Sequence, residues 1–270
     1  MKKPVLKDSV LELRGRVAVI SFNRDDVRNA LTGTALVEDL LQTLDWANRS
    51  DEISVLVVTG VGAAFSSGGN VREMQEKKGL FAGSVQQIQD QYRRGIQRIP
   101  LAMEAMEIPV IAAINGPAIG AGFDIACMCD LRLGSTKSMF GETFVNLGII
   151  PGDGGAWFLQ RLVGYQRAAE LTLTGRLVPA DEALRLGILL EVVEPELLVQ
   201  RAVELAAAIA AKPPHAVRMT KRLLKQAQRG NLSDFLSLCA CFQGMAHHTE
   251  DHVEALNAFL EKRPGVYSGR

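Results

Sequence analysis

Apolar and polar positions alternate at the beginning of the chain and then change to a helical spacing. Residues 10–23 alternate on both sides of Gly15-Arg16, which predicts a β-hairpin. Between residues 34 and 48 the apolar positions recur every three to four residues, as in an amphipathic helix. A short β-branched run at 53–58 follows. The pattern therefore predicts a hairpin, a helix and a further strand in that order.

The middle of the chain continues with short apolar runs separated by glycine-rich segments. Residues 71–95 are charged and predict a helix and loop, and a further helix is expected near 96–106. The next elements expected are a strand at 109–114, a loop at 115–122, a helix from 123 to 128, and short strands at 131–133 and 139–140. Strands that are apolar throughout are typical of a sheet covered on both faces, which indicates an α/β fold.

Beyond Gly164 the composition shifts to Ala, Leu, Glu and Arg, and the pattern becomes helical. We divide the chain into a core, residues 1–200, and a helical appendage, residues 201–270. Helices are expected near 166–173, 180–186, 197–211, 214–228, 232–246 and 249–262.

Composition and charge exclude several classes of protein. The 270 residues contain 30 Lys+Arg and 30 Asp+Glu, so no overall field attracts nucleic acid or an anionic membrane. The N-terminus lacks the apolar region of a secretory signal, and the most apolar stretch, 108–129, is interrupted by polar residues. We therefore expect a soluble, cytoplasmic protein that binds neither nucleic acid nor a membrane.

The four cysteines form two C-x-C pairs, Cys127/Cys129 and Cys239/Cys241. This spacing matches neither a zinc knuckle nor a C-x-x-C redox motif, so we expect buried, reduced thiols. His247, His248 and His252 include a pair four residues apart, but no acidic helix motif accompanies them. The sequence predicts no metal site.

Two segments share one design, in which an apolar strand is followed by small residues and then by a helix. They are residues 65–74 and 115–124. Glycines allow a ligand to approach the backbone, and N–H groups at a helix start can stabilise negative charge on an oxygen. The alternative is that the glycines only form tight turns. Neither segment contains G-x-G-x-x-G, G-x-x-x-x-G-K-[ST] or G-x-S-x-G, which argues against dinucleotide-binding, P-loop and α/β-hydrolase sites.

Taken together, these segments resemble the crotonase (enoyl-CoA hydratase/isomerase) superfamily. The resemblance implies a spiral of ββα units that forms two roughly perpendicular sheets, followed by a C-terminal helical trimerisation region. It also implies a homotrimer or dimer of trimers, an acyl-CoA thioester substrate, a place in fatty acid metabolism, and no cofactor besides the coenzyme A of the substrate. The resemblance covers nearly the whole chain, at residues 10–24, 65–74, 108–130, 140–155, 173–176 and 183–187.

By position in the family motifs, the backbone N–H groups of Gly69 and Ala121 are the expected oxyanion hole, which holds the thioester oxygen. Family hydratases carry one glutamate in the helix after the second glycine loop and another about twenty residues later. These positions match Asp124 and Phe144 in this chain. One carboxylate is thus shortened and the other is missing.

Three carboxylates are therefore candidates for the catalytic acid or base, and we rank Asp124 first, Asp153 second and Glu142 third. Asp124 alone occupies a family acid position, Asp153 follows the isomerase position that is Gly152 here, and Glu142 precedes Phe144 by two residues. Each has a structural alternative. Asp124 can cap or complement its helix, Glu142 can pair with an arginine at a subunit contact, and Asp153 can set the turn.

Other site residues follow from the same resemblance. An acyl pocket is expected at Phe144, Met74 and Trp157. The last helix of family members often reaches the nucleotide bound by a neighbouring subunit, which suggests a role for its basic residues. The candidates for binding coenzyme A are Arg24, Val27, Arg28, Ala30, Ser67, Gly68, Lys262 and Arg263.

The leading function is an enoyl-CoA hydratase or isomerase that stabilises a thioester enolate. The missing glutamate and the Pro151–Gly155 motif favour an alternative, a Δ3,Δ2-enoyl-CoA or ring-opening isomerase that uses a single carboxylate. A second alternative is a catalytically silent subunit that binds acyl-CoA. Thioester binding without turnover would distinguish it from both enzymes.

Overall fold

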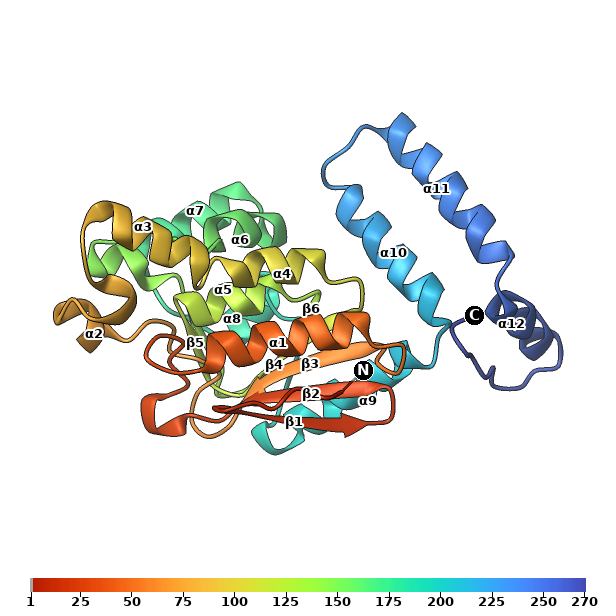
Figure 1. Ribbon diagram of the computed structural model, residues 1–270, viewed down its shortest axis with the longest axis horizontal. Helices are drawn as coiled ribbons and strands as arrows, with labels where there is room; N and C mark the ends of the chain where they lie inside the picture. Colours follow the sequence, from red (N-terminus) through yellow and green to blue (C-terminus); the bar gives the residue numbers. More distant parts are fainter. Residues whose placement is uncertain (1) are drawn as a thin grey trace.

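A six-stranded sheet forms the centre of the computed structural model, which describes residues 2–270. Its first two strands are the predicted antiparallel hairpin, and Gly15 in the turn has a φ of 61°. The other strands follow in parallel (Figure 1), in the order β1-β2-β3-β4-β6-β9. The strands are β1 (Ser9–Arg14), β2 (Val17–Phe22), β3 (Val55–Gly60), β4 (Val110–Ile114), β6 (Leu131–Ser135) and β9 (Glu191–Val193).

A second sheet of three short strands lies beside the first. It consists of β5 (Pro117–Ile119), β7 (Met139–Gly141) and β8 (Val178–Pro179) in the order β5-β7-β8. The segment 115–122, expected to be a loop, therefore contains strand β5. Strands β8 and β9 are also absent from the sequence-based expectation, because runs of two or three residues carry no measurable periodicity.

Helices surround the sheets. Most predicted helices are found with boundaries shifted by a few residues. The segment 71–95, expected to be one helix and a loop, contains two helices, and a further helix, α6, was not predicted because it starts at the glycine pair Gly154-Gly155. The α-helices are α1 (Leu36–Arg49), α2 (Val71–Gln75), α3 (Val85–Arg94), α4 (Arg98–Ala105), α5 (Ala121–Met128), α6 (Gly155–Val163), α7 (Tyr165–Thr174), α8 (Ala180–Arg185), α9 (Leu198–Ala210), α10 (Pro214–Gln226), α11 (Leu232–His247) and α12 (Glu250–Leu260).

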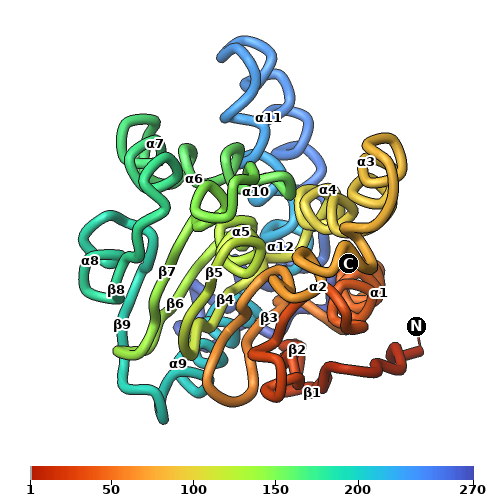
Figure 2. Tube along the Cα trace, turned by 90° about the vertical axis from the view of Figure 1, so that its left-hand side faces the viewer, coloured from red at the N-terminus to blue at the C-terminus, as the bar shows by residue number. Residues whose placement is uncertain are grey.

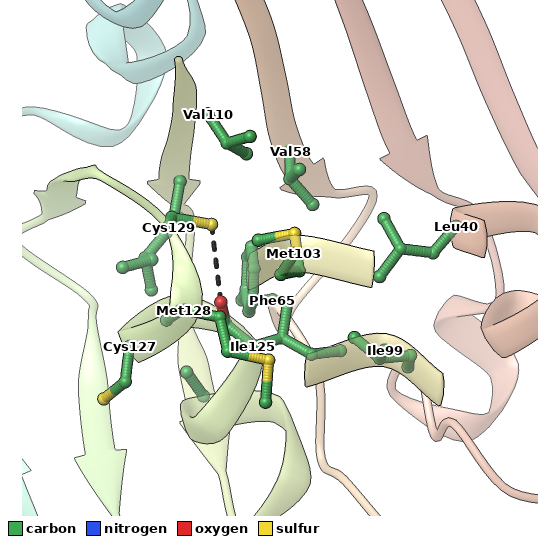
Figure 3. Packing of buried hydrophobic residues seen from close by; sticks show 14 of the residues in the cluster. Leu40, Val58, Phe65, Ile99, Met103, Val110, Ile125, Cys127, Met128 and Cys129 are labelled. Atoms are coloured by element: carbon green, nitrogen blue, oxygen red, sulfur yellow. Dashed lines mark hydrogen bonds between the residues drawn. The ribbon is translucent and has the colours of Figure 1, made fainter. Parts of the chain in front are cut away.

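The central strands are buried on both faces, and their alternation divides the core into two clusters. Leu56 and Val58 of β3 belong to the larger cluster, together with residues of α1, α4 and α5. Val55 and Val57 of the same strand pack with α9 on the opposite face (Figure 2). Figure 3 shows the larger cluster around Phe65, where side chains from α4 and α5 meet the strands. The predicted α/β arrangement is therefore confirmed.

The helical C-terminal region begins later than the expected division at residue 200. Helix α9 crosses that position and packs on the sheet through Leu198, Ala202 and Ala206. Helix α10 is held to the core by Lys221, which donates to the Ile108 carbonyl and pairs with Asp130, whereas α11 and α12 extend away from the body of the molecule (Figure 1). The described part of α11 contains no buried residue. The region that stands apart from the core therefore starts at α11.

The cysteine prediction is correct for only one pair. Cys127 and Cys129 are buried free thiols, and burial raises the pKa of Cys129 to about 12. Cys239 is half-buried and Cys241 is exposed, because α11 is not covered by the rest of the chain. No helix between residues 2 and 270 has both the length and the apolar character that a bilayer crossing requires.

Candidate active site

The two glycine segments meet backbone to backbone. A Cβ atom on Gly68, whose φ is 75°, would lie 2.5 Å from the Ile119 carbonyl oxygen and 3.0 Å from the Ala121 nitrogen. A Cβ atom on Gly122 would lie 2.3 Å from the Ser66 carbonyl oxygen. Glycine is therefore needed at both positions, since any side chain would force the two segments apart. This contact brings the segment after β3, which contains Gly69, next to the segment after β4, which contains Ala121.

Gly69 and Ala121 present two backbone donors beside one cavity. Ala121 is the first residue of α5, and Gly69 precedes Asn70, the N-cap of α2. Both line a small cavity of about 20 Å³. Within residues 2–270, neither backbone N–H donates a hydrogen bond. Two free N–H groups near helix starts are the arrangement that an oxyanion requires.

The cavity is mainly apolar, and its volume corresponds to roughly one water molecule. Phe144 closes one side, with its ring 3.5 Å from the position of a Cβ on Gly120. Thr32, Tyr92 and Asp153 are the polar side chains along the wall. The lining residues are Thr32, Gly69, Met74, Leu80, Phe81, Tyr92, Ile96, Ala121, Phe144, Ile149 and Asp153.

Two of the three expected acyl-pocket residues, Met74 and Phe144, line this cavity, whereas Trp157 does not. Trp157 is 47% exposed and lines a separate cavity of about 790 Å³ beside α10. The guanidinium of Arg161 stacks 3.4 Å from the centroid of its ring. In this chain Trp157 therefore faces away from the glycine segments.

The three candidate carboxylates cluster next to the cavity but differ in what they face. Asp124, Glu142 and Asp153 are 0%, 1% and 4% exposed. Asp153, in the turn before α6, is the only one of the three that lines the cavity. Asp124 and Glu142 are packed behind it. The sequence-based ranking, which put Asp124 first, thus differs from the order of access to the cavity.

Asp124 and Glu142 converge on the N-terminus of α6. The Gly155 N–H donates to Asp124 Oδ2 at 3.1 Å. A Cβ on Gly155 would lie 2.1 Å from Asp124 Oδ1 and 2.6 Å from Glu142 Oε1. Asp124 therefore does not cap its own helix, although it does lie in the first turn of α5, as the same alternative expected, and its carboxylate accepts from the next helix. Among the described residues Glu142 pairs with no arginine.

Burial dominates the ionisation of this cluster. It raises the pKa of Asp124 well above its usual range, and the neighbouring charges of Glu142 and Asp153 raise it further. Burial also raises the pKa of Glu142 to about 7 and that of Asp153 to about 6, although in both cases donation by a protonated Asp124 opposes the rise. Tyr92, next to Asp153, has a raised pKa for the same reason.

The expected coenzyme A segments are also adjacent. The Ser67 N–H donates to the Arg28 carbonyl at 3.0 Å, and Ala30 forms a β-bridge with Gly68. Val27 is linked to the same contact through the Ser67 hydroxyl. Arg24 is already paired with Asp8 and Asp26, on a partly exposed side chain.

Lys262 and Arg263 lie far from these segments within one chain. Both follow α12, which lies at the opposite end of the molecule from α2 (Figure 1). Arg263 pairs with Glu254 and Glu261 at the surface. The structure of one chain therefore does not bring these two residues to the cavity.

Comparison with known proteins identifies the family. The family model for enoyl-CoA hydratase/isomerase matches residues 12–270. The chain belongs to this family. It is 36% identical to a short-chain-enoyl-CoA hydratase from Clostridium acetobutylicum, over 96% of each chain, and 34% identical to a crotonyl-CoA hydratase from Syntrophomonas wolfei, over 94% and 95%.

A crystal structure of an enoyl-CoA hydratase from Bacillus anthracis superimposes with a TM-score of 0.91 at 34% identity. The match covers 98% of this chain and 100% of that one. The crotonase fold expected from the sequence is thus confirmed, and the family places the chain among enzymes that act on acyl-CoA thioesters.

Several cavity residues were not predicted from the sequence. Tyr92 and Ile96 come from the region of α3 and α4, and Leu80 and Phe81 from the turn before it. The sequence contains no motif for them, because they reach the cavity only when the charged segment 71–95 folds back over the glycine loops. The amphipathic pattern of α3 was the one available signal, since it leaves Ile88 and Tyr92 on one face.

Proposed function

We propose that this protein binds an enoyl-CoA thioester with its carbonyl oxygen between the Gly69 and Ala121 N–H groups, and that Asp153 is the catalytic base. The observation that carries the proposal is that Asp153 lines the same cavity as both donors. Removing a proton from the acyl chain places negative charge on the thioester oxygen, and the two N–H groups stabilise this enolate.

The environment of Asp153 suits a base that works near neutral pH. Burial raises its pKa to about 6, so at pH 7 the group is mostly ionised yet more basic than an ordinary carboxylate. Asp124 and Glu142 do not line the cavity and therefore support Asp153 without contacting substrate. A single base that removes a proton and returns it to another carbon favours isomerisation.

Hydration is a second candidate, because the relatives named above are hydratases. A hydratase holds a water molecule between two carboxylates, whereas the second family position is Phe144 here. We expect Phe144→Glu to increase crotonyl-CoA hydration, with Phe144→Leu as the matched control that enlarges the cavity without adding an acid. Hydration by the unmodified protein at the rate of a two-glutamate relative would favour the hydratase.

The test of the isomerase proposal is conversion of a short 3-enoyl-CoA to the conjugated 2-enoyl-CoA, followed by the rise in thioester absorbance. Conversion that exceeds hydration supports the proposal. Tight binding of both thioesters with neither reaction would instead favour the silent binding subunit. The proposed chemistry moves a proton only, and therefore needs no metal or redox cofactor.

We also propose that coenzyme A lies along Val27–Ala30 and Ser67-Gly68, whose backbones are joined next to the cavity. Lys262 and Arg263 would then serve the nucleotide of a neighbouring copy. The exposed apolar residues Leu232, Leu236 and Phe259 of α11 and α12 support such self-association. Light scattering on the purified protein tests it, with a trimer or a dimer of trimers expected and a monomer as the contrary result.

A further inference from the structure

Three buried carboxyl oxygens next to the cavity lack a hydrogen-bond partner. They are Asp124 Oδ1 and both Oε atoms of Glu142. Buried polar atoms in folded proteins are nearly always paired, and two ionised carboxylates packed together repel each other. An ionised Asp124 would therefore leave these oxygens without a donor and would place two negative charges next to each other. A proton between the two groups would supply the missing donor.

The contacts of Gly155 identify which oxygen carries this proton. Its N–H donates to Asp124 Oδ2 at 3.1 Å, so Oδ2 acts as an acceptor. Oδ1 is the oxygen without a partner, and Glu142 Oε1 lies against the same point of the chain, because a Cβ on Gly155 would lie 2.1 Å from Asp124 Oδ1 and 2.6 Å from Glu142 Oε1. A proton on Oδ1 is therefore placed to reach the carboxylate of Glu142.

We propose that Asp124 is a protonated carboxylic acid at neutral pH, and that its Oδ1–H donates to Glu142 and thereby positions the carboxyl cluster behind the cavity. Asp124 is then a positioning residue and not the base. The protonation state does not depend on the proposed function, whereas the positioning role rests on the proposed function of Asp153.

The charged groups around Asp124 favour its neutral form. Glu142 lies before the 3-10 turn Thr143–Leu147, and Asp153 lies in the turn before α6; both add negative charge. Burial raises the pKa of the neighbouring thiol, Cys127, well above its usual range, so this group is uncharged. Tyr92 of α3, beside Asp153, is also neutral at pH 7.

The positively charged side chain near the cluster, Arg132, already binds other groups. Arg132 of β6 donates to the carbonyls of Cys129 and Ile188, and so forms no ion pair with Asp124. The N-terminus of α6 favours an ionised carboxylate. It donates only one hydrogen bond to Asp124, however, from the Gly155 N–H to Oδ2. Of the three acids, Asp124 is the most deeply buried, and the charges of both other acids raise its pKa. It is therefore the last to lose its proton as the pH rises.

Two replacements of Asp124 distinguish a role as hydrogen-bond donor from a role as catalytic base. The amide in Asp124→Asn keeps an oxygen for the Gly155 N–H and supplies an N–H for Glu142, whereas Asp124→Leu keeps the approximate volume and removes the donor. We expect Asp124→Asn to retain at least about a tenth of the exchange rate at the acyl carbons in D2O. We expect Asp124→Leu to lose at least about a hundredfold.

The pH profile gives a readout that a purely structural role would not change. A hydrogen-bond donor at Asp124 lowers the pKa of Glu142 and that of Asp153. Its loss in Asp124→Leu therefore moves the acid limb of the rate profile from near 6 to higher pH, by about one unit. In Asp124→Asn the limb is expected to stay where it is in the parent.

Infrared spectroscopy tests the protonation state without any substrate. At pH 8 the parent protein should show the C=O stretch of a protonated carboxyl group, and the band should be missing from Asp124→Asn. A parent spectrum without this band overturns the proposal, as does an Asp124→Asn variant that loses exchange as completely as Asp153→Asn. If Asp153→Asn exchanges normally while the infrared band is present, the function proposed for Asp153 fails and the assignment of a neutral Asp124 stands.

Discussion

Asp153 and the backbone of Ala121 line one cavity, although 32 positions separate them in the sequence. Ala121 opens α5 and Asp153 lies just before α6, so the packing of α5 on α6 brings a carboxylate to a free N–H group. The proposed function thus puts proton removal and stabilisation of the resulting charge at the same place.

The N–H of Ala121 can be removed without changing the surrounding side chains. Ala121 is the first residue of a helix, the position at which proline is best tolerated, because its missing N–H leaves no helical hydrogen bond unmade. We expect Ala121→Pro to lower kcat by about two to three orders of magnitude. Ala121→Ser, which keeps the N–H, is the control. Equal rates in both variants, with unchanged circular dichroism, would contradict the oxyanion hole.

Gly155 should tolerate no side chain. A Cβ there would lie 2.1 Å from Asp124 Oδ1, and both the buried acid and the helix start would have to move. We expect Gly155→Ala to lower the free energy of unfolding by about 1–3 kcal/mol in urea denaturation. Gly244→Ala is the matched helical control, because nothing lies within 4 Å of its Cβ and alanine favours a helix. Similar stabilities for the two variants would show that the acid cluster adapts.

The ionisation of Glu142 links stability to pH. Its pKa rises from 4.5 to about 7 on folding, so the folded state holds the proton more tightly. The corresponding stability is fully present below pH 4.5 and is lost as the pH rises through 7, by on the order of 3 kcal/mol. We expect Glu142→Gln to show a smaller loss of unfolding free energy between pH 5 and pH 8 than the parent. Parallel curves for the two proteins would rule out this role of Glu142.

Sequence periodicity predicted the elements that have enough residues to show it. The hairpin and α1 contain complete alternating or helical repeats, whereas β5 and β8 have only three and two residues. Helix α6 was missed because its first residue is Gly155, whose small size serves the acid cluster rather than the helix. Glycine has a low helix propensity, but the contacts of Gly155 with Asp124 and Glu142 leave no room for a larger residue.

Gly69 and Ala121 were assigned as the expected oxyanion hole from the family resemblance, and the structure brings both residues to one cavity. The order of the three acids could not be assigned in this way. A family position gave Asp124 priority, but access to the cavity depends on how the turn before α6 meets α5, which is a contact between distant segments. Tyr92 is a further case, since α3 reaches the cavity through tertiary packing alone.

The most direct test is deuterium exchange at the α- or γ-carbon of a short enoyl-CoA in D2O, followed by mass spectrometry for the parent and for Asp153→Asn. We expect the parent to exchange and the variant to be slower by about two to four orders of magnitude, with thioester binding retained. The amide preserves the shape of the side chain and removes only its basicity. Exchange by Asp153→Asn at the parent rate would contradict the central claim.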